Sequence, residues 1–297
     1  MKKNNIIVTG GSGFIGSCLV KNLSKKNKII ILDKKEPSSI SNFNKNVRFY
    51  KLDLNSKERL FKIISEINPN IIVHLAAQST IDMVKKKRKF YLRDNIDSTI
   101  NIVNACNKFN IEKLIFSSSA AVYKKGQNKL NENSLIFSNN IYGKTKIYNE
   151  KYLTKKLAKS KCGILRFFNV CSSDRKNKVG ELHNPETHLI PLIVNKIKQN
   201  EIIKVYGNTY NTYDGTCIRD YVHIKDVVDG INKLIKYLNK QDYGVFNLGS
   251  GDGFSILEII KECEKRLKSK AKVIFAKKRF GDSDRLVCNI NKAETKL

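Results

Sequence analysis

The sequence is short of several residue types: its 297 residues include no tryptophan, two methionines and four prolines, and no long uninterrupted apolar run. A membrane-spanning helix needs about 20 mostly apolar residues, so we expect no membrane partner. The first residues, Met1 to Asn5, pass directly into a strand pattern and leave no room for a signal peptide. These absences favour a globular, cytoplasmic protein.

Cysteine pairs with the spacing of a metal or redox site are also missing. The chain has seven cysteines, none of them in a Cys-x-x-Cys pair, and most lie within apolar segments. This distribution is typical of reduced core thiols in a reducing compartment. We therefore expect neither a disulfide framework nor a metal site. The cysteines are Cys18, Cys106, Cys162, Cys171, Cys217, Cys263 and Cys288.

Acidic residues are scarce relative to basic ones, at 27 against 56, which gives a formal net charge of +29. Such an excess raises the question of a nucleic-acid partner. The lysines, however, are spread over nearly every helical pattern, and the densest run, Lys85 to Lys89, has aromatic residues only at its end. We predict no specific nucleic-acid partner, although the charge could help to gather a phosphate-bearing substrate.

Strand and helix patterns alternate through the first half of the chain. Strands are predicted at 5–9, 29–32, 47–51, 71–75, 113–117 and 163–167, and helices from the first glycines to about 24 and at about 57–66, 95–108 and 142–159. Alternation over such a length predicts a parallel sheet with helices on both faces. The predicted fold class is α/β, with a doubly wound parallel sheet in a first domain covering residues 1–168.

This alternation stops after residue 168. The sequence becomes rich in loops around Pro185 and Pro191, with helical patterns near 191–200, 225–238 and 255–267 and a strand pattern at 245–248. We predict a smaller, substrate-binding domain over residues 169–297.

A glycine-rich turn follows the first strand. Gly10, Gly13 and Gly16 lead into the first helix, with Phe14 and Ile15 between the last two. Such glycines let the backbone approach a pyrophosphate at a helix N-terminus, where free N–H groups and the helix dipole favour anions. The turn predicts a dinucleotide cofactor.

Asp33 ends the second strand, at the position where a dinucleotide-binding sheet holds the adenosine ribose hydroxyls. Its carboxylate would repel a 2′-phosphate, which favours NAD over NADP, although Lys34 and Lys35 could soften the discrimination. The alternative is an ordinary turn residue at a strand end.

Small and polar residues follow the other strands of the predicted sheet. Ligands bind parallel sheets of this kind at the carboxyl ends of the strands. One edge of the sheet should therefore collect the site. The candidates are Asp53, Leu54, Leu75, Ala76, Ala77, Ser117, Ser118, Ser119 and Asn169.

Tyr142 and Lys146 lie four residues apart on one face of a predicted helix. A cation close to a phenol favours the phenolate and lowers the tyrosine pKa, which makes Tyr142 a candidate proton shuttle. Taken alone, the pair is also compatible with an aromatic side chain packed on a basic surface helix.

The order of these motifs resembles that of the extended short-chain dehydrogenases/reductases, which carry a Rossmann-type NAD-binding domain. Within that superfamily, segments 180–191 and 206–226 resemble the UDP-glucose 4-epimerase family, and the resemblance extends over essentially the whole chain. It implies an NAD-dependent isomerase that interconverts UDP-galactose and UDP-glucose through a transient 4-keto sugar and bound NADH. It also implies a homodimer.

Carried over residue by residue, the resemblance implies that Tyr142 is the acid/base. It also implies that Lys146 binds the nicotinamide ribose and lowers the pKa of the tyrosine. Ser119 would hydrogen-bond the sugar oxygen that is oxidised, while Asn95 and Ala77 would line the cofactor site. Leu286 would lie beside the substituent on C2 of the sugar. The residues implied to hold the uridine diphosphate and to form its loop are Asn169, His188, Leu189, Tyr206, Arg219, Arg279 and Asp282.

Three features depart from the family pattern. Lys124 stands where the family usually has glycine after Val-Tyr, and residues 82–89 are unusually basic. Both should affect the conformation of the cofactor loop. Family members also usually continue past the position of Leu297 with another strand and helix, so the chain is expected to be short at this end.

Other functions remain open at this point. A 4,6-dehydratase of the same fold needs an Asp-Glu pair directly after the active-site hydroxyl, whereas this chain has Ala120 and Ala121. Another nucleotide-sugar epimerase would share the motifs. A non-catalytic NAD-binding regulatory protein would keep the fold without turnover, but the intact Ser119, Tyr142 and Lys146 favour an enzyme.

Overall fold

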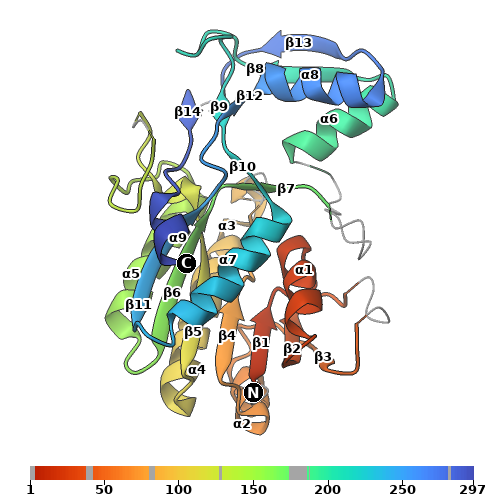
Figure 1. Cartoon of the computed structure of the whole chain (residues 1–297). Helices are drawn as coiled ribbons and strands as arrows, with labels where there is room; N and C mark the ends of the chain where they lie inside the picture. The colour runs from red at the N-terminus through yellow and green to blue at the C-terminus, as the bar shows by residue number, and fades with distance from the viewer. Residues whose placement is uncertain are drawn as a thin grey trace.

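A seven-stranded parallel sheet organises the computed structural model, which describes residues 4–37, 43–79, 84–126, 129–173, 186, 188–279 and 282–297, with only the backbone at 84–87. The strand order is β11-β6-β5-β4-β1-β2-β3 (Figure 1). The chain order reverses between β1 and β4, which is where a doubly wound sheet binds ligands. The strands are β1 (Asn5–Thr9), β2 (Lys28–Asp33), β3 (Val47–Lys51), β4 (Ile71–His74), β5 (Lys113–Ser119), β6 (Lys161–Phe167) and β11 (Tyr243–Leu248).

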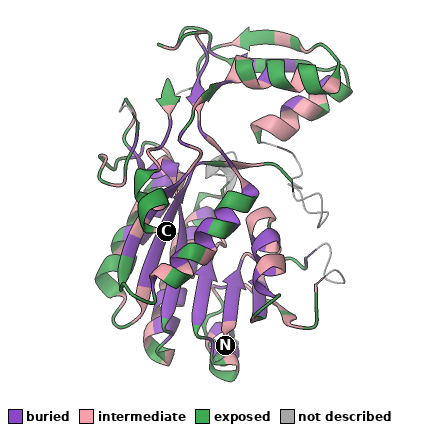
Figure 2. Ribbon diagram, viewed as in Figure 1, coloured by how far each residue is buried: buried purple, intermediate pink, exposed green. Residues whose placement is uncertain are grey.

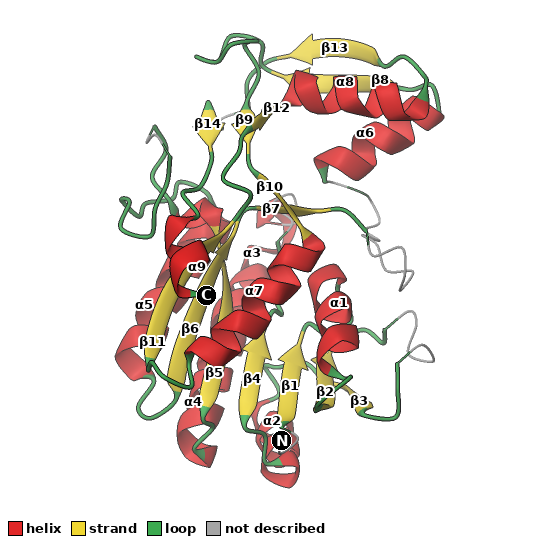
Figure 3. Ribbon diagram, in the orientation of Figure 1, coloured by secondary structure: helices red, strands yellow, loops and turns green. Residues whose placement is uncertain are grey.

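Helices cover both faces of this sheet (Figure 3). One face packs against α1 (Phe14–Leu23) and α7 (Ile224–Tyr237), and the other packs against α2 (Lys57–Ile67), α4 (Ser98–Phe109) and α5 (Ile141–Lys156). Burial on both faces explains why the central strands are continuous runs of isoleucine, leucine and valine (Figure 2). The predicted α/β class and the parallel sheet are confirmed.

The helix predicted at 95–108 starts earlier and contains an irregular turn. An α-helical segment, α3 (Val84–Leu92), runs through the π-helical turn η3 (Arg93–Asp97) into α4. A π-turn inserts a residue into the helical ladder and is often found at functional sites. Here it contains Asn95, one of the predicted cofactor residues.

A second layer of short elements lies beyond the carboxyl edge of the sheet (Figure 1). Its helices α6 (Leu189–Lys198) and α8 (Ile256–Leu267) pack together and against the parallel pair β8 (Ile202–Tyr206) and β13 (Lys272–Ala276), around a small apolar cluster. The other short strands form two small sheets. These strands are β7 (Asn169–Cys171), β9 (Ile218–Arg219), β10 (Tyr221–His223), β12 (Phe254–Ser255) and β14 (Arg285–Leu286).

The structure corrects the predicted division into two domains at residue 168, because later elements return to the main sheet. Strand β11 pairs with β6 throughout its length, and α7 packs on the main sheet beside α1. The final helix, α9 (Asn291–Lys296), also contacts β11. The chain thus leaves the sheet after β6, returns to it for α7 and β11, and leaves again, so the smaller layer comes from two separate segments.

No helix within the described ranges has the length and apolar character needed to cross a membrane.

Candidate active site

The glycine turn between β1 and α1 packs tightly against the segment that follows β4. Gly10 has φ of +69°, and a Cβ there would lie 2.8 Å from the backbone nitrogen of Ala76. A Cβ on Gly16 would lie 2.2 Å from the Gly10 carbonyl oxygen. At Gly13, which caps α1, an added Cβ would lie 3.4 Å from that carbonyl oxygen, an ordinary contact distance. Gly13 is exposed and carries no side chain, so the backbone at the start of α1 can be approached by a pyrophosphate.

Asp33 is held in a fixed position at the end of β2. Its carboxylate accepts hydrogen bonds from the backbone N–H groups of Ser12 and Lys35, both at 3.1 Å. The ammonium of Lys34 lies 2.8 Å from Asp94 and 3.3 Å from Asp53. We expected Lys34 to weaken the discrimination against NADP. Its ammonium is instead held by two other carboxylates, which opposes that effect.

Asn95 contributes to the cofactor edge through a loop. Its side chain is buried, accepts a hydrogen bond from the Gln78 N–H at 2.7 Å and donates one to the Gln78 carbonyl at 3.0 Å. Asn149 on α5 in turn donates to the Asn95 carbonyl at 2.7 Å. These contacts fix the segment Leu75–Ala77 beside the glycine turn.

Lys146 is one helical turn after Tyr142 on α5, as predicted. It is only 2% exposed, and its Nζ donates a hydrogen bond to the Ser117 carbonyl at 2.7 Å. Its Nζ lies 5.6 Å from the centre of the Tyr142 ring. Asn140 caps the start of the helix by accepting a hydrogen bond from the Gly143 N–H at 2.7 Å, which places Tyr142 in the first turn. Ser119, at the end of β5, hydrogen-bonds the Tyr142 phenol.

The predicted lowering of the Tyr142 pKa is wrong. Burial raises the pKa of Tyr142 to about 12, and the hydrogen bond with Ser119 opposes this only in part. Burial also lowers the pKa of Lys146 to about 7, against the opposing charge of Glu150. Both side chains lose water, and this loss disfavours the charged form of each more than their neighbours restore it.

A buried polar network lies behind this pair, and our sequence reasoning missed it. Glu150 accepts a hydrogen bond from Ser118 at 2.5 Å and binds the Arg166 guanidinium through both oxygens, at 3.0 and 2.8 Å. Arg166 also donates to the Tyr123 hydroxyl at 3.0 Å. Two signals were available: Glu150 lies four residues after Lys146, and Arg166 interrupts an otherwise apolar strand.

His74 is a second buried polar residue that the sequence analysis did not consider. Its ring nitrogens lie 2.7 Å from the Thr9 hydroxyl and 3.1 Å from the Thr99 hydroxyl. Burial, together with the charge of Lys146, lowers the pKa of His74 to about 3. The imidazole is therefore neutral and links β1, β4 and α4 beneath the predicted cofactor edge.

A cavity of about 360 Å³ opens beside Ser119. Arg219 is fixed in its wall, because one guanidinium nitrogen donates to the carbonyls of Ile218 at 2.9 Å and Ser283 at 2.8 Å. The other lies 3.8 Å from Asp282. Five predicted residues line the cavity: Ser119, Asn169, Arg219, Asp282 and Leu286.

Two lysines line the same cavity without having been predicted there. We expected Lys124 to affect the conformation of the cofactor loop, but both Lys124 and Lys125 face the cavity with Arg219. The departure from the family pattern therefore falls on the predicted substrate side of the site. The other basic departure, residues 82–89, lies largely outside the residues whose side chains the structure describes.

Four other predicted substrate residues do not line this cavity. The Arg279 guanidinium stacks on the Tyr206 ring, 3.8 Å from its centre, at the C-terminal end of β8. His188 and Leu189 begin α6, where His188 pairs with Glu186 at 3.4 Å. Much of the preceding segment, 174–185 and 187, lies outside the described residues.

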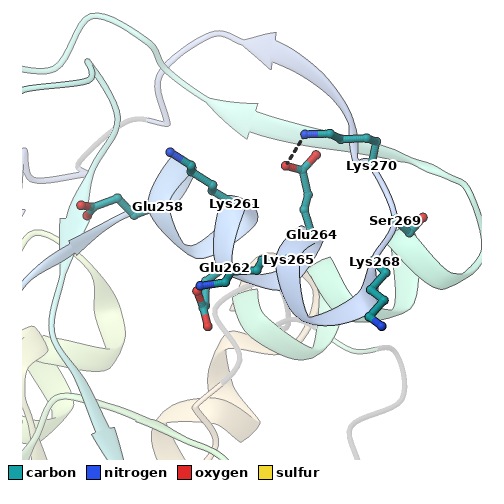
Figure 4. A pocket seen from close by; sticks show the side chains of 8 residues that line it. All are labelled: Glu258, Lys261, Glu262, Glu264, Lys265, Lys268, Ser269 and Lys270. Carbon is teal, nitrogen blue, oxygen red and sulfur yellow. Dashed lines mark ion pairs between the residues drawn. The ribbon is translucent and has the colours of Figure 1, made fainter.

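A larger hollow, about 670 Å³, lies along α8 (Figure 4). Acidic and basic side chains share its lining, and Lys270 pairs with Glu264 there at 3.5 Å. None of the predicted site residues lines it. The cavity beside Ser119 is therefore the candidate site.

Comparison with known proteins identifies the family. Residues 6–249 match the NAD dependent epimerase/dehydratase family, and the chain belongs to that family.

Its relatives within the family include several UDP-glucose 4-epimerases. The enzyme of Lactobacillus helveticus is 35% identical over 301 residues, covering 98% of this chain and 90% of that protein. The crystal structure of UDP-glucose 4-epimerase from Bifidobacterium longum in complex with NAD+ and UDP is 28% identical, with a TM-score of 0.89 over 99% of this chain and 92% of that one. The UDP-Glc/GlcNAc 4-epimerase from Campylobacter jejuni is also 28% identical, with a TM-score of 0.84 over the same shares.

Proposed function

We propose that this protein is a UDP-glucose 4-epimerase that interconverts UDP-galactose and UDP-glucose. The observation that carries the proposal is the meeting of Ser119 and Tyr142 beside a cavity whose wall contains Arg219 and Asp282. A proton-transfer group thus lies next to a site suited to an anionic nucleotide. The names of the relatives support the same reaction.

In this proposal the nucleotide is the anchor. Arg219 would pair with the diphosphate, since a guanidinium matches phosphate oxygens with two parallel hydrogen bonds. Asp282 would accept hydrogen bonds from ribose hydroxyls, and Asn169 lies on the same wall. A nucleotide held in this way leaves the hexose free to present either face of C4 to Ser119 and Tyr142.

The cofactor site consists of the glycine turn, Asp33 and the loop held by Asn95. NAD held there would supply the hydride acceptor and donor that inversion at C4 requires. Gly10, Gly13 and Gly16 would admit its pyrophosphate, Asp33 its adenosine ribose and Lys146 its nicotinamide ribose.

Tyr142 is the proposed acid/base. Its phenol would exchange a proton with the C4 oxygen, and Ser119 would hydrogen-bond the same oxygen. Since burial raises the pKa of Tyr142 to about 12, the phenolate needs a nearby positive charge to form near neutral pH. Lys146 is the adjacent ammonium, and any added negative charge in the site would raise its own pKa from about 7 and keep it protonated.

The decisive test uses UDP-galactose deuterated at C4, with purified protein and no added NAD. The UDP-glucose that forms should keep its deuterium at C4, as measured by mass spectrometry and proton NMR. Extensive loss of label to solvent, or a requirement for stoichiometric NAD, would contradict the proposal.

A 4,6-dehydratase is the nearest alternative, and the cavity disfavours it. Elimination of water needs an additional acid/base group close to the reacting sugar. Among the described residues that line the cavity, the single carboxylate is Asp282, which faces Arg219 at 3.8 Å. Ala120 and Ala121 stand after the active-site hydroxyl. Incubation with a UDP-hexose should therefore yield no 4-keto-6-deoxy sugar.

We further propose that the protein acts as a homodimer in the cytoplasm. Tyr148 on α5 is 44% exposed and stacks on Tyr152, which offers an aromatic surface for a second copy. Five of the seven cysteines are buried, at positions 18, 106, 162, 217 and 288, which suits core thiols in a reducing compartment. Sedimentation velocity at several concentrations measures the assembly, and a monomer at all of them would refute the dimer.

A further inference from the structure

The substrate cavity contains more positive charge than the predicted residues account for. Its described lining includes three basic side chains, Lys124, Lys125 and Arg219, and one carboxylate, Asp282. Arg279, the second cation implied for the diphosphate, stacks on Tyr206 outside this lining. A UDP-sugar carries one negative charge on each phosphate. A second cation besides Arg219 would match the second of these two charges.

Lys125 is in the best position for this role. It is half-buried, whereas Lys124 beside it is exposed. It lines the same cavity as Arg219 and Asp282, the two residues proposed to hold the nucleotide. Burial and the like charge of Arg219 lower the pKa of Lys125, while Asp282 opposes them. An incoming anion would relieve this unfavourable environment.

We propose that Lys125 binds the diphosphate of the substrate together with Arg219, as the second cation of that subsite. This inference rests on the proposed function and adds a residue that the family pattern does not supply. Because the diphosphate does not change during epimerisation, Lys125 holds substrate and transition state alike. Its loss should therefore raise KM and leave kcat nearly unchanged.

The test measures equilibrium binding of UDP and of uridine to the protein loaded with NAD, by titration calorimetry. A hydrogen bond to a charged group contributes ~1.5–3 kcal/mol, so Lys125→Met should weaken UDP binding by about tenfold or more. Uridine has no phosphate, and its affinity should stay the same. Lys125→Arg should restore most of the UDP affinity. Lys129→Met, an exposed lysine outside the cavity lining, is the matched control.

The outcomes separate this inference from the proposed function. An unchanged ratio of UDP to uridine affinity in Lys125→Met would overturn the role of Lys125, even if the wild-type protein epimerises UDP-galactose. A drop in that ratio for Arg279→Met alone would assign the second cation to Arg279. If the wild-type protein binds UDP but does not turn over UDP-galactose, the reaction is wrong while Lys125 is still tested. If it does not bind UDP, both proposals fall.

Discussion

The two walls of the site are built in different ways. On the sheet side, Lys146, Glu150, Arg166 and His74 are all buried and tied to their neighbours by hydrogen bonds. On the side of the smaller layer, Arg219 and Asp282 are partly exposed, and Leu286 comes from a strand of two residues. The proposed chemistry thus rests on the more buried wall, and the proposed recognition of the nucleotide rests on the more exposed one. Substitutions in the first should damage turnover and stability, and those in the second mainly affinity and selectivity.

The largest effect is expected at Tyr142. Tyr142→Phe removes the hydroxyl that would exchange a proton with the C4 oxygen. Positioned acid/base groups commonly raise the rate of a reaction by ~10²–10⁴-fold. The kcat for UDP-galactose should fall by at least that range, with NAD affinity nearly intact, as measured by steady-state kinetics and cofactor titration. Retention of more than a tenth of wild-type kcat would show that another group moves the proton.

Next comes the buried pair Glu150 and Arg166. Arg166→Met leaves the Glu150 carboxylate without its partner, and such a change typically destabilises a protein by ~3–5 kcal/mol. Urea unfolding should show this loss, whereas Glu150→Gln/Arg166→Met should be less destabilised than the sum of the single variants. An exposed pair, Arg266 and Glu262, offers the contrast: Arg266→Met should cost less than about 1 kcal/mol.

The third prediction concerns pH. The pKa of His74 is lowered to about 3 in the folded protein from its ordinary 6.5, so the unfolded chain binds more protons between these values. Folding stability should be fully present above pH 6.5 and decline as the pH falls towards 3, by up to ~1.4 kcal/mol per pH unit. His74→Gln should flatten this decline in urea unfolding at pH 4.5–7. A parallel decline in both proteins would mean that other groups cause it.

A smaller effect is expected at Asp33, on the sheet side of the site, where a substitution should change the choice of cofactor. Asp33→Ser removes the carboxylate that we propose to repel a 2′-phosphate and to bind ribose, so the preference for NAD over NADP should narrow by ~10–100-fold. Equilibrium binding of both cofactors to the cofactor-free protein measures the change. Equal affinity of the unmodified protein for the two cofactors would refute the role of Asp33.

The smallest effect is expected at Leu286, on the more exposed wall of the site. Leucine leaves room beside the C2 substituent, so we expect some activity on UDP-N-acetylglucosamine, a substrate class named for the Campylobacter jejuni relative. Leu286→Tyr should reduce that activity by about tenfold relative to UDP-galactose, with little change in stability. Unchanged relative rates would remove Leu286 from the specificity site.

The sequence predicted the sheet side well because its signals are local. Strand, turn and helix follow one another along the chain, so β1, β3 and the Tyr142–Lys146 spacing fell where expected. The more exposed wall joins segments that are far apart in the sequence: Ile203 pairs with Val273, and Ile218 pairs with both Ser255 and Arg285. Strands of two or three residues have no readable period. The pKa of Tyr142 was missed for a related reason, since burial depends on the whole packed structure.

The return of β11 to the main sheet has a consequence for how the protein is made. Strand β6 is complete at residue 167, but its outer neighbour β11 begins only at Tyr243. While the intervening chain is being synthesised, the apolar β6 is an unpaired edge, open to association with other chains. A nascent chain that stops before Tyr243 carries every predicted catalytic residue but lacks the last strand of its sheet. Release from the ribosome at that point should therefore yield aggregates.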